Sequence, residues 1–351
     1  MSIHPMVKAF VFGLAGAMLF IFIGAPMPWL LGPLFSVLLI QLFTPLKLKW
    51  HPTFRNSGLV VAGYVIGYAF TLEALQGMKQ YFVAMLLINI AFFILFLLIS
   101  WLMATRTKVD TGTAMTCCVP GGLSQIIIFA EEQKGIELAA VTFYHVLRVL
   151  LIVAIVPFIV ASGSSPHVEA QEDGGFSLYL IGLLVLCYFA GMLSQKVKIP
   201  TGYLLGPVFL MMCFNLLGIE VPMMPSQLLH IAQLLIGIYI GLLLKKEDLK
   251  LTKKLVFYSF FSSAVLIVFA YGLSFVLQNY YALSFTTSFL SVVPGGLDQM
   301  GIIAASVHAD VTIVTAFQLF RILFLSAIIV PFVKIMAGKV DKANHALKNS
   351  L

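Results

Sequence analysis

The chain has 351 residues, of which 61% are hydrophobic and only 10% are charged, and its mean hydropathy is +1.04. Soluble domains carry about 25% charged residues, so the composition excludes a soluble globular protein and indicates a polytopic membrane protein. The net charge of +7 comes from Lys and Arg in short segments between apolar runs, where such residues set orientation in the bilayer. We therefore expect a lipid bilayer, and no nucleic acid, as the partner.

Apolar segments follow one another along the whole chain. A spanning helix needs about 20 mostly apolar residues, and the first half has candidate elements at 9–24, 29–43, 56–72, 80–103, 111–131 and 137–161. The second half has them at 177–194, 203–218, 228–244, 255–278, 284–304 and 311–335. The longest polar stretch, 162–175, lies between the halves and is predicted to be a loop.

The two halves are copies of one unit, related by a shift of 174 residues. Leu31-Gly32-Pro33 falls on Leu205-Gly206-Pro207, and Pro120-Gly121-Gly122-Leu123 falls on Pro294-Gly295-Gly296-Leu297. One residue is then lost, so that Arg148 matches Arg321. We divide the chain into repeat 1 (1–161), an acidic loop (162–176), repeat 2 (177–335) and a basic tail (336–351).

Basic residues occupy non-equivalent loops in the two copies. In the first copy they follow the second and fourth elements, as Lys47, Lys49, Arg55, Arg106 and Lys108. In the second copy they follow the first and third elements, as Lys196, Lys198, Lys245, Lys246, Lys250, Lys253 and Lys254. Because cytoplasmic loops carry the excess of Lys and Arg, the copies are predicted to lie upside down relative to each other.

Inversion requires an odd number of crossings per copy, so one of the six elements in each copy must fail to cross. The candidate is the segment broken by Pro-Gly-Gly. We therefore predict an all-α integral membrane protein of two inverted repeats, with about ten transmembrane helices and two re-entrant segments. The acidic loop would be periplasmic and both termini cytoplasmic.

The Pro-Gly-Gly breaks are the candidate binding site. Pro costs about 3 kcal/mol and Gly about 1 kcal/mol in a helix interior, and irregular backbone at membrane depth survives only inside protein or beside a wet cavity. Paired breaks in inverted copies mark the midplane site of a transporter, whereas a packing kink is the alternative. The predicted substrate- or ion-binding residues here are Pro120, Gly121, Gly122, Ser124, Gln125, Pro294, Gly295, Gly296, Asp298 and Gln299.

Asp298 is the ionisable member of this set, and Ser124 occupies its position in the first copy. An ionisable residue inside a membrane segment indicates function, so Asp298 would bind a coupling cation or a proton. Ser124 and Gln125 would offer hydrogen bonds to substrate. The alternative, compatible with the first, is that Asp298 and Ser124 cap the resumed helices. Helices that resume near Leu123 and Leu297 would aim N–H groups at the centre and favour an anion.

One arginine lies near the middle of the last apolar element in each copy. Arg148 and Arg321 each cost about 2.5–3.5 kcal/mol on insertion, so they should face protein or water. His145 and Gln318 stand three residues earlier, on the same helical face. One interpretation is that the arginines hold an anionic substrate and that His145 titrates near neutral pH. The other is that the arginines pair with carbonyls freed by the breaks, or with Asp298, and that His145 is simply hydrogen-bonded.

These paired motifs resemble the AbrB family of bacterial polytopic membrane proteins. The resemblance rests on Leu-Leu-Gly-Pro, Pro-Gly-Gly-Leu, Ala309-Asp310 and Gln318-Leu319-Phe320-Arg321, and it covers nearly the whole chain. It implies an inner-membrane protein whose family motifs fall on residues 120–125 and 294–299 and on Arg148, Asp310 and Arg321, while Glu137 departs from the commoner Asp. Family members carry provisional labels: ammonia monooxygenase, regulator of gene expression, or membrane protein.

The function we expect is secondary transport of a small solute, an organic anion rather than a cation, coupled to an ion or proton. A membrane sensor or scaffold that acts indirectly on gene expression is the alternative. A membrane-bound monooxygenase is more remote, because the seven His residues are scattered without metal-ligand spacing. We expect no enzyme activity, no cofactor and no metal. A homodimer is left open beside a monomer.

Overall fold

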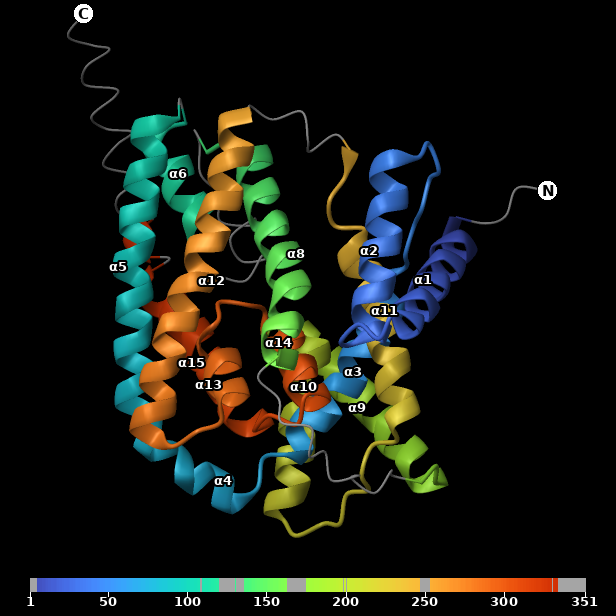
Figure 1. The fold of residues 1–351 in the computed structure, drawn as a ribbon. Coiled ribbons are helices and arrows are strands. Elements are labelled where there is room, and N and C mark those ends of the chain that lie inside the picture. The colour runs from blue at the N-terminus through green and yellow to red at the C-terminus, as the bar shows by residue number, and fades with distance from the viewer. Residues whose placement is uncertain are drawn as a thin grey trace, which may run out of the picture.

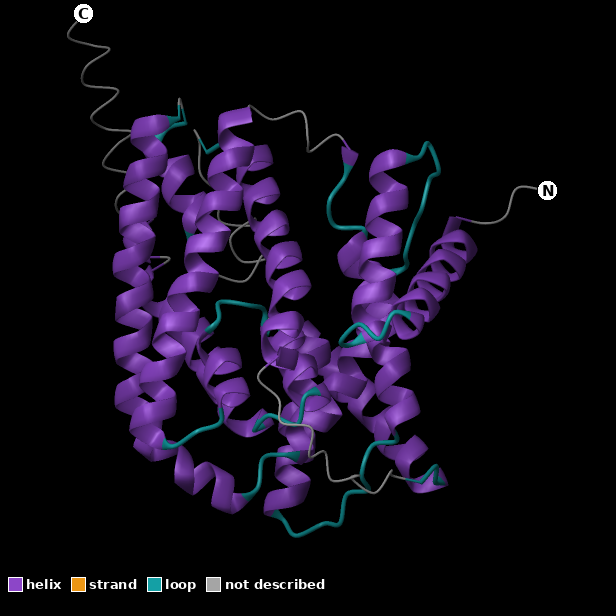
Figure 2. Cartoon of the chain, in the orientation of Figure 1, coloured by secondary structure: helices purple, strands orange, loops and turns teal. Residues whose placement is uncertain are grey.

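The computed structural model of the chain describes residues 5–107, 109–119, 130, 136–162, 175–197, 199, 201–246, 253–329 and 331–333. Every regular element within these residues is a helix, and loops connect the helices (Figure 2). The predicted all-helical fold is therefore confirmed for this part of the chain.

The helices pack into two bundles that stand side by side (Figure 1). Bundle A consists of α1 (Pro5–Phe22), α2 (Pro28–Phe43), α3 (Pro52–Tyr68), α9 (Leu178–Lys196), α10 (Gly202–Leu216) and α11 (Ser226–Gly241). Bundle B consists of α5 (Phe82–Arg106), α6 (Thr111–Cys118), α8 (Leu138–Ser162), α12 (Lys253–Tyr281), α13 (Phe285–Val292), α14 (Leu297–Ser306) and α15 (Val311–Phe324). The short helices α4 (Leu72–Gly77) and η1 (Met78–Tyr81) lead from α3 to α5, and a π-helical segment, η3 (Leu325–Ile329), extends α15.

Six of the described helical segments are long and apolar enough to cross a membrane: Pro5–Phe22, Met78–Arg106, Leu138–Ala161, Leu178–Lys196, Lys253–Tyr281 and Val311–Val333. Three further apolar helices, α2, α10 and α11, have 15 or 16 residues. Large apolar side chains are exposed on the outer helices, for example on α1, α5, α9 and α12. Lipid accommodates such surfaces, and these helices indicate a multi-pass membrane protein.

Helix boundaries agree with the apolar segments, with one difference that matters for the site. The element expected from residue 56 begins at Pro52, because a proline fits the first turn of a helix and the His51 side chain accepts a hydrogen bond from the Thr53 N–H. Arg55, expected in a loop, therefore lies in the first turn of α3.

Glycines allow the helices of bundle A to approach each other closely. A Cβ on Gly237 of α11 would lie 2.5 Å from the carbonyl oxygen of Leu30 on α2, and a Cβ on Gly63 of α3 would collide with that of Leu204 on α10. Leu204 in the second copy corresponds to Leu30 in the first, and Gly237 corresponds to Gly63, each by the shift of 174 residues. The two copies therefore use the same close contact, and each contact joins one copy to the other.

The Pro-Gly-Gly segment of the second copy runs into bundle B and returns. α13 ends at Val292 and α14 begins at Leu297, with the connecting loop at mid-height of the bundle (Figure 1). The N–H of Asp310, at the start of α15, donates to Oγ1 of Thr287, at the start of α13, across 3.0 Å. The start of α13 and the start of α15 therefore lie beside each other at the same end of the bundle. The first copy has the matching bond from the Glu137 N–H to Thr113 Oγ1, at 3.1 Å.

Candidate functional site

Asp298 lies in the first turn of α14, directly after the Pro-Gly-Gly break, and is 7% exposed. Its Oδ2 atom is 3.9 Å from Nη2 of Arg55, which comes from α3 in bundle A. The Arg55 guanidinium also lies over the ring of Tyr239 of α11, 4.6 Å from the ring centroid. An acidic group of bundle B thus meets a basic group of bundle A where the two bundles touch.

The glycines of the break leave space for this arrangement. A Cβ on Gly296 would collide with the side chains of Gln299 and Asp298, and a Cβ on Gly295 would collide with that of Met300. Larger residues here would displace the side chains of Asp298, Gln299 and Met300 from their present positions. Unpaired N–H groups at this helix terminus favour negative charge, as provided by Asp298 or a bound anion.

Gln299 carries a buried polar atom without a partner. The residue is 8% exposed, and its Oε1 atom has no hydrogen bond within the described part of the chain. A buried acceptor left unpaired costs about 1–3 kcal/mol, which is the cost that a bound donor such as a protonated group or a cation would remove.

Three further contacts join the bundles near α14. Nε2 of Gln233 on α11 donates to Oγ of Ser306 on α14 at 2.5 Å, and Oγ1 of Thr312 on α15 donates to the Ala69 carbonyl, just after α3, at 2.6 Å. A Cβ on Gly301 would collide with Ile66 of α3. The two polar bonds lie at helix ends, beside an apolar core that packs across both bundles.

Arg321 caps the end of α13. Its Nη1 atom donates to the carbonyl of Val293 at 2.7 Å, and its Nη2 atom donates to the carbonyls of Ser291, at 3.2 Å, and Val292, at 2.5 Å. These carbonyls are freed where the break ends the helix, and the C-terminus of a helix favours a cation. Arg148 donates in the same way from Nη1 to the Val119 carbonyl at the end of α6, at 2.8 Å.

A polar side chain one turn earlier completes each cap. His145 Nδ1 lies 2.9 Å from Arg148 Nη2, and its Nε2 lies 3.0 Å from the Thr116 carbonyl. In the second copy, Gln318 Oε1 accepts from Arg321 Nη1 at 3.0 Å, while its Nε2 donates to the Leu290 carbonyl at 2.9 Å. Because an arginine can only donate, His145 accepts at Nδ1 and donates from Nε2 as a neutral ring.

The predicted site residues therefore fall into two groups in space. His145, Arg148, Gln318 and Arg321 surround the ends of α6 and α13, whereas Asp298 and Gln299 lie at the start of α14. Pro120, Gly121, Gly122, Ser124 and Gln125 lie outside the described residues. The geometry agrees with the interpretation in which the arginines pair with carbonyls freed by the breaks.

Sequence reasoning missed Arg55 and Tyr239 as members of the site. The His51-Pro52 pair was a signal that a helix starts early enough to include Arg55. No sequence pattern indicated that this arginine would meet Asp298, because the two residues come from different copies and different bundles.

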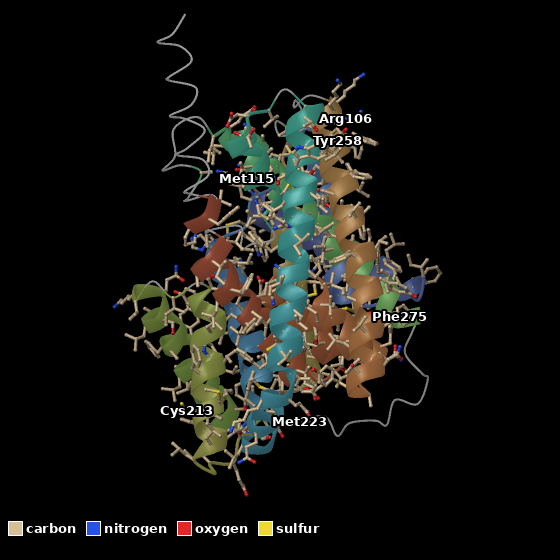
Figure 3. The ribbon with its side chains drawn as sticks, turned by 90° about the vertical axis from the view of Figure 1, so that its left-hand side faces the viewer. Arg106, Met115, Cys213, Met223, Tyr258 and Phe275 are labelled. Atoms are coloured by element: carbon tan, nitrogen blue, oxygen red, sulfur yellow. The ribbon has the colours of Figure 1, made fainter. Side chains whose placement is uncertain are left out.

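A cavity of about 620 Å³ lies where α3 and α10 end and α9 begins; its lining includes Tyr68, Tyr179, Asn215 and Glu220. Figure 3 shows Cys213 and Met223, which belong to this end of the molecule, far from Arg106. Within the described ranges, no group of three His, Cys, Asp or Glu side chains is placed to hold a metal ion.

Comparisons with known proteins identify relatives over most of the chain. The family model described as transition state regulatory protein AbrB matches residues 29–337. The chain is 24% identical over 348 residues to "Uncharacterized protein YhjN" of Bacillus subtilis (strain 168), covering 92% of this chain and 90% of that protein. It is 26% identical over 253 residues to "Putative regulator AbrB" of Escherichia coli (strain K12), covering 69% and 72%. No solved structure matches the chain.

Proposed function

We propose that this chain, which belongs to the family described as transition state regulatory protein AbrB, is a secondary transporter of a small solute in the bacterial inner membrane. The observation that carries the proposal is the contact between Asp298, at a helix break deep in bundle B, and Arg55 of bundle A. Intramembrane ionisable residues at discontinuous helices are the sites at which transporters bind substrates and coupling ions.

The packing of the copies supports an inverted repeat. The matched glycine contacts and the matched bonds at Thr113 and Thr287 relate each copy to the other. α5 rises in Figure 1, whereas its counterpart α12 descends beside it. We therefore propose two inverted repeats with about ten crossings and both termini in the cytoplasm, since inverted units of odd crossing number build alternating-access transporters.

In the mechanism that we propose, bundle B moves against bundle A and exposes the start of α14 alternately to each side. Bundle B carries the Pro-Gly-Gly segment of the second copy, and the junction along which it must slide combines apolar packing with a few side-chain hydrogen bonds. Protonation of Asp298, or a cation bound to it, would release Arg55 and so link the ion to the movement.

A small organic anion is the substrate class that the charges favour. Arg321 and Arg148 are occupied by carbonyls at the helix ends, so Arg55 is the cation better placed to receive an anion. Its side chain is 27% exposed, and its distance of 3.9 Å from the Asp298 carboxylate is longer than a hydrogen bond. The start of α14 adds its partial positive charge on the other side.

The test is transport by the purified protein in liposomes. Solute-evoked currents and pH changes would be recorded for small carboxylic acids, amino acids and ammonium, with and without a pH gradient. Asp298→Asn should abolish coupled transport, because the amide neither binds a proton nor carries charge. Arg55→Gln should raise the KM for an anion at least tenfold, since a charge-assisted hydrogen bond contributes about 1.5–3 kcal/mol.

Asp310→Asn is the matched control. Asp310 caps α15 through a 2.9 Å bond to the Ile313 N–H, and Asn caps a helix as well as Asp does. This variant should transport like the unaltered protein. If Asp298→Asn transports with unchanged coupling, or if the folded protein moves none of these solutes, the transporter proposal loses its main support.

The names of the family and of the relative from Escherichia coli favour a second candidate, a membrane sensor or scaffold in gene regulation. Such a protein would bind a solute at the same junction without moving it. A solute that stabilises the protein against heat but never crosses the liposome membrane would favour the sensor.

A further inference from the structure

A basic pocket lies at the end of bundle B where α5 ends and α12 begins. Its volume is about 380 Å³, and its lining includes Arg106, Lys253, Lys254, Phe257 and Tyr258. Figure 3 shows Arg106 and Tyr258 together at this end of the molecule. Three cations and two aromatic rings thus line one pocket. The pocket lies between α5 and α12, whereas Asp298 lies on α14.

The three cations have no partner of their own. Within the described residues, none of them takes part in a hydrogen bond or an ion pair. Asp110, the acidic residue nearest to Arg106 in the described sequence, is engaged as the N-cap of α6, with Oδ2 2.9 Å from the Gly112 N–H. Among the described residues, no acidic side chain pairs with these cations, and an anion is the ligand that would balance their charge.

The floor of the pocket is fixed by buried contacts. Leu255 is 2% exposed and packs in a cluster with Met103 of α5. The hydroxyl of Tyr144 on α8 donates to the Tyr258 carbonyl at 2.9 Å. The relative positions of α5 and α12 at this end are thereby held, so the cations are presented by a rigid surface.

The side of the pocket continues into an apolar surface. Lys253, Phe257 and Phe261 are spaced four residues apart and share one face of α12. The two phenylalanine rings stack with centroids 6.3 Å apart, and they are 63% and 40% exposed. On α5, Trp101 is 67% exposed one to two turns before Arg106. Cations at the helix ends, followed by exposed aromatic rings, match a phosphate headgroup above acyl chains.

We propose that this pocket binds an anionic phospholipid, with the headgroup phosphate between Arg106, Lys253 and Lys254 and the acyl chains along Phe257 and Phe261. The shared chemistry is a phosphate anion, which free phosphate also has. The exposed rings of Phe257 and Phe261 favour the lipid, because acyl chains can pack against them and free phosphate cannot. The inference does not depend on transport.

The test uses the full-length protein stripped of lipid in detergent. Retained lipid would be identified by native mass spectrometry, and unfolding temperature would be measured with phosphatidylglycerol, cardiolipin, phosphatidylcholine or inorganic phosphate added. The anionic lipids should bind and raise the unfolding temperature, and the other two additions should not. Combined Arg106→Gln, Lys253→Gln and Lys254→Gln substitution should weaken anionic-lipid binding about a hundredfold, since each cation contributes several-fold.

Lys47→Gln with Lys49→Gln is the control for charge alone. Both residues are exposed in the loop after α2, whose end lies at the same end of the molecule in Figure 1. This variant should bind anionic lipid like the unaltered protein. Equal binding by the triple variant, or equal loss in the control, would overturn the pocket. Stabilisation by inorganic phosphate to the same extent would overturn the lipid as its occupant.

Discussion

At the scale of single residues, the two copies solve one problem with different side chains. Each break leaves carbonyls without partners at the end of a half-helix, and an arginine from the last helix donates to them. His145 and Gln318 then do the same work, because each accepts from the arginine and donates to a carbonyl one turn earlier. A neutral imidazole and a primary amide are interchangeable for this purpose.

His145→Gln should therefore preserve the fold, and His145→Leu should not. The amide can reproduce both bonds, as Gln318 does in the second copy. Leucine would remove both hydrogen bonds of the ring and leave the buried Thr116 carbonyl without its donor, at about 1–3 kcal/mol. The midpoint of thermal unfolding in detergent would measure the difference. Equal loss of stability in both variants would show that the ring has a role that an amide cannot fill.

The sequence indicated which polar residues lie within apolar segments, and it indicated less about which residues they contact. Polar groups in apolar segments identified Asp298, Arg148 and Arg321, because burial of such groups has a cost that needs a reason. The carbonyl caps followed from the same logic, since a break frees acceptors that only a donor can satisfy. The Arg55–Asp298 contact depends on how the bundles stand together, and no local pattern encodes that arrangement.

At the scale of helices, the length of the apolar runs and the positions of Pro and Gly predicted where most helices lie. α13 and α14 are separated at the Pro-Gly-Gly break, as that motif requires. The short helix α4 was missed because it lies between two predicted apolar elements, and the π-helical segment after α15 was missed because it continues the apolar pattern. Small residues allow helices to approach closely, and the structure places Gly63 and Gly237 against backbone carbonyls.

Gly237→Ala and Gly272→Ala should have opposite effects. A Cβ at Gly237 would lie 2.5 Å from the Leu30 carbonyl oxygen, so α2 and α11 must separate, at a cost of about 1–3 kcal/mol. A Cβ at Gly272 of α12 meets nothing within 4 Å, and Ala favours a helix over Gly by about 1 kcal/mol. Unfolding temperatures of the two variants in one detergent would test this. A neutral Gly237→Ala variant would mean that the helices of bundle A are not held as closely as the structure shows.

At the scale of the whole molecule, the repeats and the bundles divide the chain differently. Among the described residues, each repeat contributes its first three helices to bundle A and its later long helices to bundle B. Sequence comparison finds the repeats because they are continuous in the chain. The bundles cannot be recognised from the sequence, because each one combines helices from both copies. In bundle A the close glycine contacts join helices of different copies or neighbouring helices. Relative motion, if it serves transport, must occur between bundles and leave these contacts intact.

A cross-link between the bundles should therefore stop transport, whereas one within a bundle should not. Gln233→Cys with Ser306→Cys replaces two side chains that are hydrogen-bonded across the junction. Tyr68→Cys with Asn215→Cys is the control, because Asn215 Nδ2 lies 2.7 Å from the Tyr68 carbonyl and both residues belong to bundle A. Both pairs would be made with Cys213, which is exposed, replaced by Ser.

A short bifunctional thiol reagent would be applied to the protein in liposomes, and uptake would be compared before and after cross-linking and after reduction. The junction pair should lose most of its transport when cross-linked and regain it on reduction, because a fixed junction can face only one side of the membrane. The bundle A pair should keep its rate throughout. Transport that continues after complete cross-linking of the junction would show that the bundles do not move against each other there. In that case the solute path must open by smaller movements around Asp298.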